Sequence, residues 1–220
     1  MYLPGHFALD DLAVVAEFVD QAGSADLVTF DGARPVSTLL PVIWERPPAG
    51  SPGHGSLLGH LALANPQWQT VAAGIPGLAI VHGPQAYVSP SWYQSTREHG
   101  RAVPTWNYRT VHFTGEVVIH RDEDWIRDVV TRLTERHERG RPGRWWVADA
   151  PEQFLAGQLR AIVGVELRIA SIEAKDKLSQ NRSAEDHSNV IAALRSEPDP
   201  GSRAVADLMA ARPPRERRPG

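Results

Sequence analysis

The amino-acid sequence predicts an antiparallel β-barrel with flanking helices, an α+β fold that is mostly β. Many β-rich segments follow one another through short turns, whereas helical patterns gather near the two ends and in one insertion at about residues 122–159. The order contains no alternating strand–helix–strand units, which would predict a parallel sheet. The chain has 220 residues, 42% hydrophobic and 22% charged, and can bury one sizeable core.

The first elements are a helix and a hairpin. Apolar residues recur at helical spacing over residues 10–22, where Asp10 can cap the start and Gly23 can end the helix. An Asp-Gly pair at 31–32 lies between ADLVTF and RPVSTLLPVIWE, which predicts a β-hairpin. Pro41 indicates that the second strand lies at an edge of the sheet or ends there.

The remaining elements follow from hydrophobic periodicity and turn residues. They are a loop at 46–55, a strand at 56–64, a short helix from Asn65, strands at 77–83 and 85–90, a mobile polar loop at 94–103, a strand at 108–120, helices at 122–139 and 151–159, a strand at 161–175, a helix from Ser183 and a helix at 202–211. Ser183 and Asp186 have the spacing of a capping box.

The composition excludes several classes of protein. The chain contains no cysteine, which rules out disulfides, thiolate nucleophiles and cysteine-ligated metal clusters. Its net charge of −3 argues against a dedicated nucleic-acid binder. No signal-peptide pattern and no membrane-spanning apolar run is present, so a cytoplasmic location is expected. The motifs GxGxxG, GxxxxGK[ST], GxSxG and HExxH are also absent.

The predicted strand at 56–64 offers space beside a polar side chain. By alternation, His60 shares a face with Ala62 and Ala64, and two small residues beside a histidine leave room for a ligand. The strand runs into a helix start at Asn65, and a helix N-terminus is a ready site for phosphate. The alternative is an ordinary hydrogen-bonded strand histidine.

Aromatic and polar side chains gather at two other places. Trp92 lies in SPSWY, and Thr105, Trp106 and Asn107 lie in VPTWNY. A planar cofactor needs a flat apolar wall and a few fixed hydrogen-bonding groups, which these residues can supply. The alternative is that both indoles only close an end of the barrel.

Two cations flank a polar stretch after the last strand. In KLSQNRS, at 177–183, Lys177 and Arg182 are placed to meet a phosphate or a carboxylate. The alternative is a polar turn that caps the next helix.

Four stretches, in this order and spacing, resemble those of the PaiB family: GHLALANPQW, GPQAYVSPSWY, VPTWNYRTVHFTG and KLSQNRSAED. The opening MYLPGHF also resembles that family's start, and the similarity extends to about residue 196. The resemblance implies an FMN-binding split barrel, a homodimer with its cofactor sites at the interface, and a negative transcriptional regulator or a flavin-dependent oxidoreductase-like protein. Together with the helical pattern from Ser183 and the Arg- and Pro-rich composition of the last residues, it predicts a split-barrel domain at 1–182, a helical extension at 183–211 and a disordered tail at 212–220.

The resemblance and the two cations together define the candidate site for a flat aromatic cofactor. The candidate cofactor-binding residues are Thr38, Leu39, Pro41, His60, Ala62, Asn65, Trp92, Thr105, Trp106, Asn107, Lys177 and Arg182. One position departs from the family. Leu39 stands in Thr38-Leu39-Leu40-Pro41 where the family often has histidine, so a hydrogen-bonding side chain is lost there.

Two alternatives stand beside FMN. Heme-dependent piperazate synthases, which close an N–N bond, are similar to PaiB proteins and would imply heme b with His60 as axial ligand and His112 as the second choice. A DNA-binding repressor would use the final helices and the arginine-rich tail. Apart from heme, no metal site is expected. The sequence contains no paired carboxylates and no nucleophile–base pattern, so it leaves open whether the protein is an enzyme.

Overall fold

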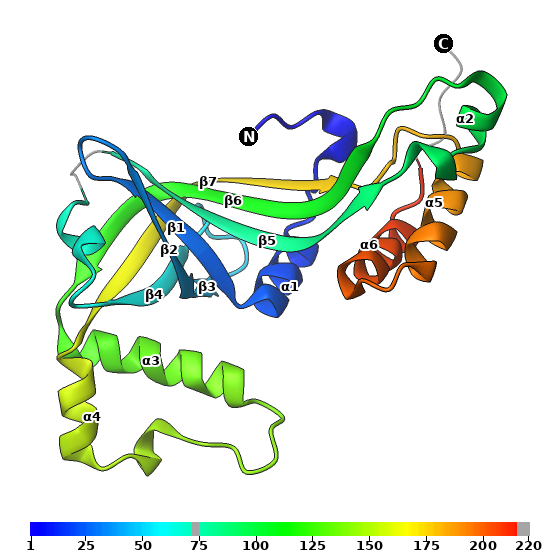
Figure 1. Cartoon of the computed structure of the whole chain (residues 1–220). Coiled ribbons are helices and arrows are strands. Elements are labelled where there is room, and N and C mark those ends of the chain that lie inside the picture. Colours follow the sequence, from blue (N-terminus) through cyan, green and yellow to red (C-terminus); the bar gives the residue numbers. More distant parts are fainter. Residues whose placement is uncertain (72–74, 215–220) are drawn as a thin grey trace. The chain divides into compact units, whose positions relative to one another are not determined.

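The computed structural model describes residues 1–71 and 75–214 and contains a seven-stranded sheet (Figure 1). The strand order is β2-β1-β5-β6-β7-β4-β3, and each pair with a defined register is antiparallel. The strands are β1 (Ser24–Phe30), β2 (Pro35–Pro41), β3 (Ile43–Glu45), β4 (Ser56–Ala62), β5 (Gly77–Val88), β6 (Thr105–His120) and β7 (Ile162–Lys177). The antiparallel sheet predicted from the sequence is therefore confirmed.

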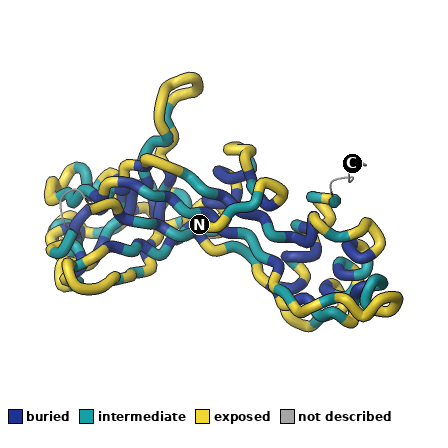
Figure 2. The backbone as a smooth tube through the Cα atoms, turned by 90° about the horizontal axis from the view of Figure 1, so that it is seen from above, coloured by how far each residue is buried: buried dark blue, intermediate teal, exposed yellow. Residues whose placement is uncertain are grey.

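Apart from α2, the α-helices occupy the predicted ends and the predicted insertion. The α-helices are α1 (Leu12–Ala22), α2 (Gln94–His99), α3 (Glu123–Glu138), α4 (Glu152–Leu159), α5 (Ala184–Ser196) and α6 (Pro200–Ala211). Short 3-10 helices are η1 (Gly5–Phe7), η2 (Pro66–Gln69), η3 (Pro90–Trp92) and η4 (Val147–Asp149). Figure 2 shows that buried positions follow the strands and the helices, while many exposed positions lie in the connections.

The chain forms two compact units. The terminal unit consists of Met1–Val15, His82–Val111 and Glu173–Gly220, and the central unit consists of Ala16–Val81 and His112–Ile172. In the terminal unit, α5 and α6 lie side by side and enclose a core with Tyr93, Leu178 and Met209 (Figure 1). In the central unit, α3 packs on β4 through Leu58 and Leu133.

The β1–β2 hairpin forms where the Asp-Gly pair predicts it. Asp31 donates its backbone N–H to the carbonyl oxygen of Arg34 at 3.1 Å, and Gly32 takes a positive φ of 96°. The register pairs Ser24 with Pro41. Because β2 is the edge strand and ends at Pro41, the missing N–H of this proline costs the sheet no internal hydrogen bond.

The start of α1 differs from the prediction by one residue. Asp11, not Asp10, caps the helix, since its Oδ1 accepts from the backbone N–H groups of Ala13 at 2.9 Å and Val14 at 3.4 Å. Two successive aspartates made this position ambiguous in the sequence. Gly23 ends the helix with a φ of 70°, as predicted.

Strand β4 is shorter and β5 is longer than predicted. β4 ends at Ala62, because the N–H of Asn65 turns back to the Ala62 carbonyl at 2.9 Å. The two predicted strands at 77–83 and 85–90 form the single strand β5. β1 pairs only with residues 78–80 of β5, so Pro84 does not have to donate a hydrogen bond to that neighbour.

The predicted polar loop at 94–103 is wrong over its first half, because residues 94–99 form α2. Ser95 donates its N–H and its Oγ–H to the carboxylate of Asp186 in α5, at 3.1 Å and 2.8 Å. The Ser183 hydroxyl accepts from the N–H of Asp186 at 3.1 Å, which confirms the N-cap half of the predicted capping box, whereas the Asp186 carboxylate binds Ser95. The short helix from Asn65 covers Pro66–Gln69, while residues 72–74 and 215–220, parts of two predictions, lie outside the described residues.

Candidate functional site

Three cations gather in the terminal unit at the end of β7. Lys177 donates hydrogen bonds to Oγ1 of Thr105 at 2.6 Å and to the carbonyl oxygen of Trp106. Burial, and then the charges of Lys175 and Arg182, hold the pKa of Lys177 below its ordinary value. The structure therefore brings together four of the predicted residues, Thr105, Trp106, Lys177 and Arg182.

Carboxylates of the described residues compensate these cations only weakly, since the charge of Arg182 contributes to the lowered pKa of Asp186 without an ion pair between the two groups. Within the described residues, Lys175, Lys177 and Arg182 form no ion pair with a carboxylate. Asp176, between the two lysines, has its carboxylate bound to Arg109 and Arg212 instead. Because successive side chains of a strand point to opposite faces of the sheet, Lys175 and Lys177 lie on the face opposite to that of Asp176. A positive charge that is only weakly compensated attracts an anion.

An exposed aromatic pair adjoins the cations. The indole of Trp106 is 53% exposed and meets the ring of Tyr87 edge to face, with centroids 6.3 Å apart. Val103, next to the same strand, is 68% exposed. This apolar surface beside a cluster of cations suits a ligand with a flat ring and an anionic group.

Asn107 and Trp92 serve the interior of the terminal unit. The Asn107 side chain is fully buried and donates to Oγ of Ser179 at 2.9 Å and to Sδ of Met209 at 3.3 Å. Ser179 takes a left-handed φ of 63°, so this bond holds a strained turn. Trp92 packs against the core of α5 and α6. Within the described residues, neither side chain forms a hydrogen bond or ion pair with Lys175, Lys177 or Arg182.

In the central unit, Thr38 and Asn65 belong to a structural network around Gln67. Asn65 caps η2 by accepting from the Gln67 N–H at 3.0 Å, and its amide donates to Oγ1 of Thr38 at 3.0 Å. Thr38 in turn donates to Oε1 of Gln67 at 2.5 Å. Because η2 is a single four-residue turn that Asn65 already caps, it offers no N-terminal site for phosphate, contrary to the sequence interpretation.

Replacing Gln67 by leucine is expected to destabilise the protein by about 2–3 kcal/mol. The Gln67 side chain is 1% exposed, and its Nε2 donates to the carbonyls of Leu27 and Val36 and to Oγ1 of Thr29. Leucine keeps the volume but leaves these buried acceptors unpaired. Urea unfolding measures the change, with the exposed Gln69 replaced by leucine as the control. A decrease in unfolding free energy of less than about 0.5 kcal/mol, the size expected for a surface substitution, would contradict a structural role for Gln67.

A second candidate site is a cleft of about 320 Å³ in the central unit. It contains His60 and Pro41 from the predicted set, together with Trp145 and the α3 residues Val130 and Leu133. Nδ1 of His60 is buried and has no hydrogen-bond partner among the described residues. Burial also lowers the pKa of His60, which favours the neutral imidazole. A neutral, unpaired imidazole in a cleft can ligate a metal or hydrogen-bond a ligand.

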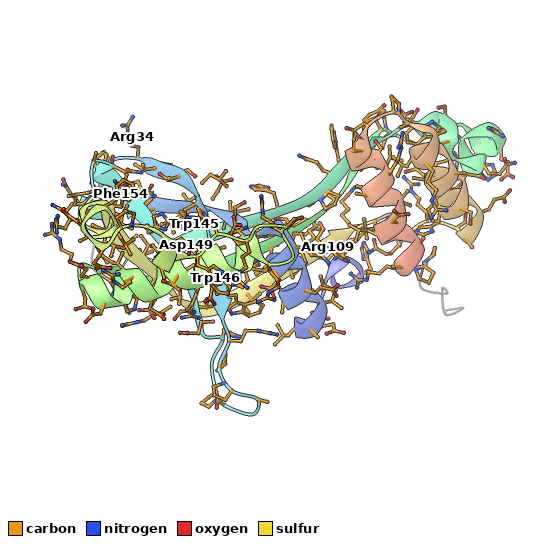
Figure 3. All side chains as sticks on the ribbon, turned by 90° about the horizontal axis from the view of Figure 1, so that it is seen from below. Arg34, Arg109, Trp145, Trp146, Asp149 and Phe154 are labelled. Atoms are coloured by element: carbon orange, nitrogen blue, oxygen red, sulfur yellow. The ribbon has the colours of Figure 1, made fainter. Side chains whose placement is uncertain are left out.

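Sequence reasoning missed Trp145, which forms a flat wall of this cleft. The residue lies in the connection between α3 and α4, beside Trp146 and Asp149 (Figure 3). Trp145 and Trp146 are 46% and 44% exposed, and two adjacent tryptophans in a polar insertion were the available signal. Of the remaining predicted residues, Leu39 is 65% exposed on β2, Ala62 is exposed at the end of β4, and His112 is partly buried on β6.

Two general features bear on function. Within residues 1–71 and 75–214, no group of three or more histidine, aspartate or glutamate side chains is arranged to hold a metal ion. None of the described helices has the length and apolar character needed to cross a membrane.

Comparison with solved structures shows the fold. The flavocytochrome Anf3 of Azotobacter vinelandii matches with a TM-score of 0.57 at 16% identity, covering 77% of this chain and 69% of that one. The conserved hypothetical protein Rv2991 of Mycobacterium tuberculosis matches with a TM-score of 0.57 at 12% identity, over 83% and 94% of the chains. An FAD- and heme-binding protein of Mycobacterium smegmatis matches with a TM-score of 0.53 at 19% identity, over 82% and 77%. The predicted split-barrel class with helices is confirmed.

Sequence comparison shows the family. Residues 1–171 match the family model described as "Putative FMN-binding domain". The "Protease synthase and sporulation protein PAI 2" of Bacillus subtilis is 34% identical over 210 residues, which cover 95% of this chain and 96% of that protein. An uncharacterised protein of Aspergillus fumigatus is 33% identical over 106 residues, covering 42% and 41% of the two chains. The chain therefore belongs to this FMN-binding-domain family, as a PaiB-type member.

Proposed function

We propose that the protein binds FMN, with Lys177 and Arg182 holding the phosphate and Trp106 contacting the flavin ring. The carrying observation is a group of cations that form no ion pair with a carboxylate of the described residues, beside an exposed indole. The donor set fits the cofactor, since ammonium and guanidinium groups bind phosphate dianions and an indole face stacks on a flat ring. Bound FMN would supply redox chemistry, and the family membership supports this choice of cofactor.

The phosphate contribution can be measured by comparing FMN with riboflavin, which lacks the phosphate. Titration into cofactor-free protein, followed by flavin fluorescence, is expected to show at least about tenfold tighter binding of FMN. Lys177→Gln and Arg182→Gln should each reduce this preference, whereas Trp106→Leu should weaken both ligands alike. Arg97→Gln removes an exposed charge of α2 and serves as the matched control. Equal affinities for FMN and riboflavin in the unaltered protein would contradict the proposal.

The pH dependence follows from the lowered pKa of Lys177. Lys177 carries its charge only below its pKa, and a lowered pKa means that the charge is lost earlier as the pH rises. FMN affinity is therefore expected to fall with rising pH before ordinary surface lysines titrate, and riboflavin affinity should not follow. The measurement is the FMN-to-riboflavin affinity ratio between neutral and alkaline pH. Lys177→Gln should abolish the dependence, and its persistence in that variant would assign it to another group.

Heme is the second candidate, favoured by the unpaired Nδ1 of His60 in the central cleft. A neutral imidazole is the axial ligand that heme iron prefers, and Trp145 with the apolar α3 residues would face the porphyrin. Titration with hemin should then give a sharp Soret band that His60→Ala loses and added imidazole restores. The exposed His99 provides the control substitution. A band unchanged in His60→Ala would rule out this ligand.

A regulatory role in a homodimer completes the proposal, with DNA contacted indirectly. The B. subtilis relative is named for protease synthesis and sporulation, which supports regulation. The α5–α6 segment, residues 184–211, contains five acidic residues and two arginines, a balance of 2 − 5 = −3. The tail at 212–220 adds four arginines and one glutamate, so helices and tail together carry no net positive charge, which disfavours DNA. Sedimentation should show a dimer. Fluorescence anisotropy with duplex DNA should show only binding that disappears at physiological salt, and salt-resistant binding to one sequence would contradict the indirect role.

A further inference from the structure

A separate cleft of about 200 Å³ lies in the central unit, at the first turns of α3. Its floor is apolar. Ile126, Leu159 and Val163 are 3%, 3% and 1% exposed, and Ile162 lies beside them. None of the predicted cofactor residues lines it. The floor alone would accept the aliphatic part of a small molecule.

Two guanidinium groups stand on the rim of this cleft. Arg121 follows β6 and Arg160 follows α4, and both exposed residues line the cleft. Neither forms an ion pair with a carboxylate of the described residues, whereas Arg127 nearby binds Glu152 at 2.6 Å. The cleft thus combines an apolar interior with two free cationic groups.

Arg121 is held in place without the use of its donors. Its guanidinium lies over the ring of Trp68, 5.0 Å from the centroid. Trp68 is itself anchored, because its Nε1–H donates to the carbonyl oxygen of Leu63 at 2.9 Å. A stacked guanidinium presents its face to the indole and keeps its N–H edge free for a carboxylate. The contact with Trp68 therefore favours this position of the exposed Arg121 side chain before a ligand binds.

One acidic residue, Glu123, also lines the cleft. Its carboxylate lies 3.7 Å from the guanidinium of Arg127 and is 51% exposed, so its charge is shared and screened. Two cations against this one carboxylate leave the rim positive. The positive rim favours a ligand with an anionic group, and the apolar floor favours an aliphatic chain attached to that group.

We propose that this cleft binds a small monocarboxylate with an aliphatic chain, as a ligand site separate from that of the flavin. The carboxylate contacts Arg121 and Arg160, and the chain lies on Ile126, Leu159 and Val163. A carboxylate suits this rim because each guanidinium can bind its oxygens through two N–H groups. The cleft volume restricts the ligand to a short chain.

The test uses 4-methylpentanoate as the probe on the full chain, with and without FMN. Isothermal titration should show binding in both cases. The neutral 4-methylpentanamide and acetate, which lacks the aliphatic chain, should each bind about threefold to tenfold more weakly. Arg121→Gln and Arg160→Gln should weaken 4-methylpentanoate to a similar extent. Arg46→Gln, which removes an exposed charge outside the cleft, should not change the affinity.

Two further variants act in opposite directions. Leu63→Glu introduces a negative charge at an exposed position of the cleft and should abolish binding, whereas Glu123→Gln removes one and should strengthen it severalfold. Both positions are exposed, so both variants should fold. Equal binding of the acid and the amide, equal binding of acetate, or unchanged affinity in Arg160→Gln would each overturn the assignment. If the unaltered protein binds 4-methylpentanoate but does not bind FMN, only the FMN proposal is contradicted.

Discussion

Replacing Asp176 by asparagine is expected to destabilise the protein by about 3–5 kcal/mol, a large part of the stability of an ordinary domain. The Asp176 side chain has no exposed surface, and its carboxylate accepts from Nε and Nη2 of Arg109 at 2.6 Å and 2.7 Å and from Nη1 of Arg212 at 2.7 Å. Asparagine keeps the shape but loses the charge. Two guanidiniums then remain around a neutral amide that turns N–H groups toward them.

The effect should extend beyond β7, because this carboxylate joins distant parts of the terminal unit. Arg109 belongs to β6 (Figure 3), whereas Arg212 follows α6 and also donates to the carbonyl oxygen of Ala8 at 3.1 Å. Arg212 lies in the segment that the sequence assigns to a disordered tail, but these bonds hold it in place. Loss of the carboxylate therefore releases the end of α6 as well as the strand that carries Lys177.

Urea unfolding measures the global loss for Asp176→Asn, and amide hydrogen exchange shows whether α6 opens first. The control is Asp207→Asn, since Asp207 is 73% exposed and its ion pair with Arg195 should contribute less than about 1 kcal/mol. FMN affinity should also fall, because Lys177 follows Asp176 directly. A loss below 1 kcal/mol, about the value for a surface pair, would show that the buried cluster relaxes or hydrates.

Replacing Gly115 by alanine is the second change with a large expected effect, about 3 kcal/mol of destabilisation. A Cβ atom at this position of β6 would lie 1.9 Å from the carbonyl oxygen of Arg168 and 3.1 Å from Cα of Ile169, both on β7. These are backbone atoms of a neighbouring strand, so they cannot move aside as a flexible side chain would. The two strands would have to separate locally and lose pairing.

The matched control is Gly157→Ala in α4. An added Cβ there meets no atom within 4 Å, and alanine favours a helix over glycine, so this variant should be more stable by up to about 1 kcal/mol. Thermal and urea unfolding of the two variants should therefore shift in opposite directions. Stability of Gly115→Ala equal to that of the unaltered protein would mean that β6 and β7 adjust at little cost.

Much of the local structure could be predicted because its causes lie within a few residues. The Asp-Gly turn, the caps at Asn65 and Ser183 and the amphipathic pattern of α3 all depend on neighbours in sequence. The prediction of a loop at 94–99 was wrong for the complementary reason. Helix α2 is short and polar, and Ser95 anchors it to Asp186, 91 positions away.

The candidate site was predicted only in part, for the same physical reason. The motifs pointed to Thr105, Trp106, Lys177 and Arg182, which the structure brings together in the terminal unit. They could not show that the side chains of Thr38 and Asn107 form their hydrogen bonds within the protein. They also could not show that Trp145 and His60 line the same cleft, because no local pattern relates residues so far apart in the sequence.

By itself, the sequence determined the antiparallel fold class, the family, and the residue types available for a flat anionic cofactor. Alternation, turn residues and motif spacing are local properties, and they survive without coordinates. Only the tertiary structure decided which polar groups remain free. Asp176 pairs with Arg109 and Arg212, so it does not pair with the neighbouring lysines, which form no ion pair within residues 1–71 and 75–214. Pairing of this kind depends on packing between residues far apart in the sequence. Polar groups that this packing leaves without a partner are the ones that a ligand can bind.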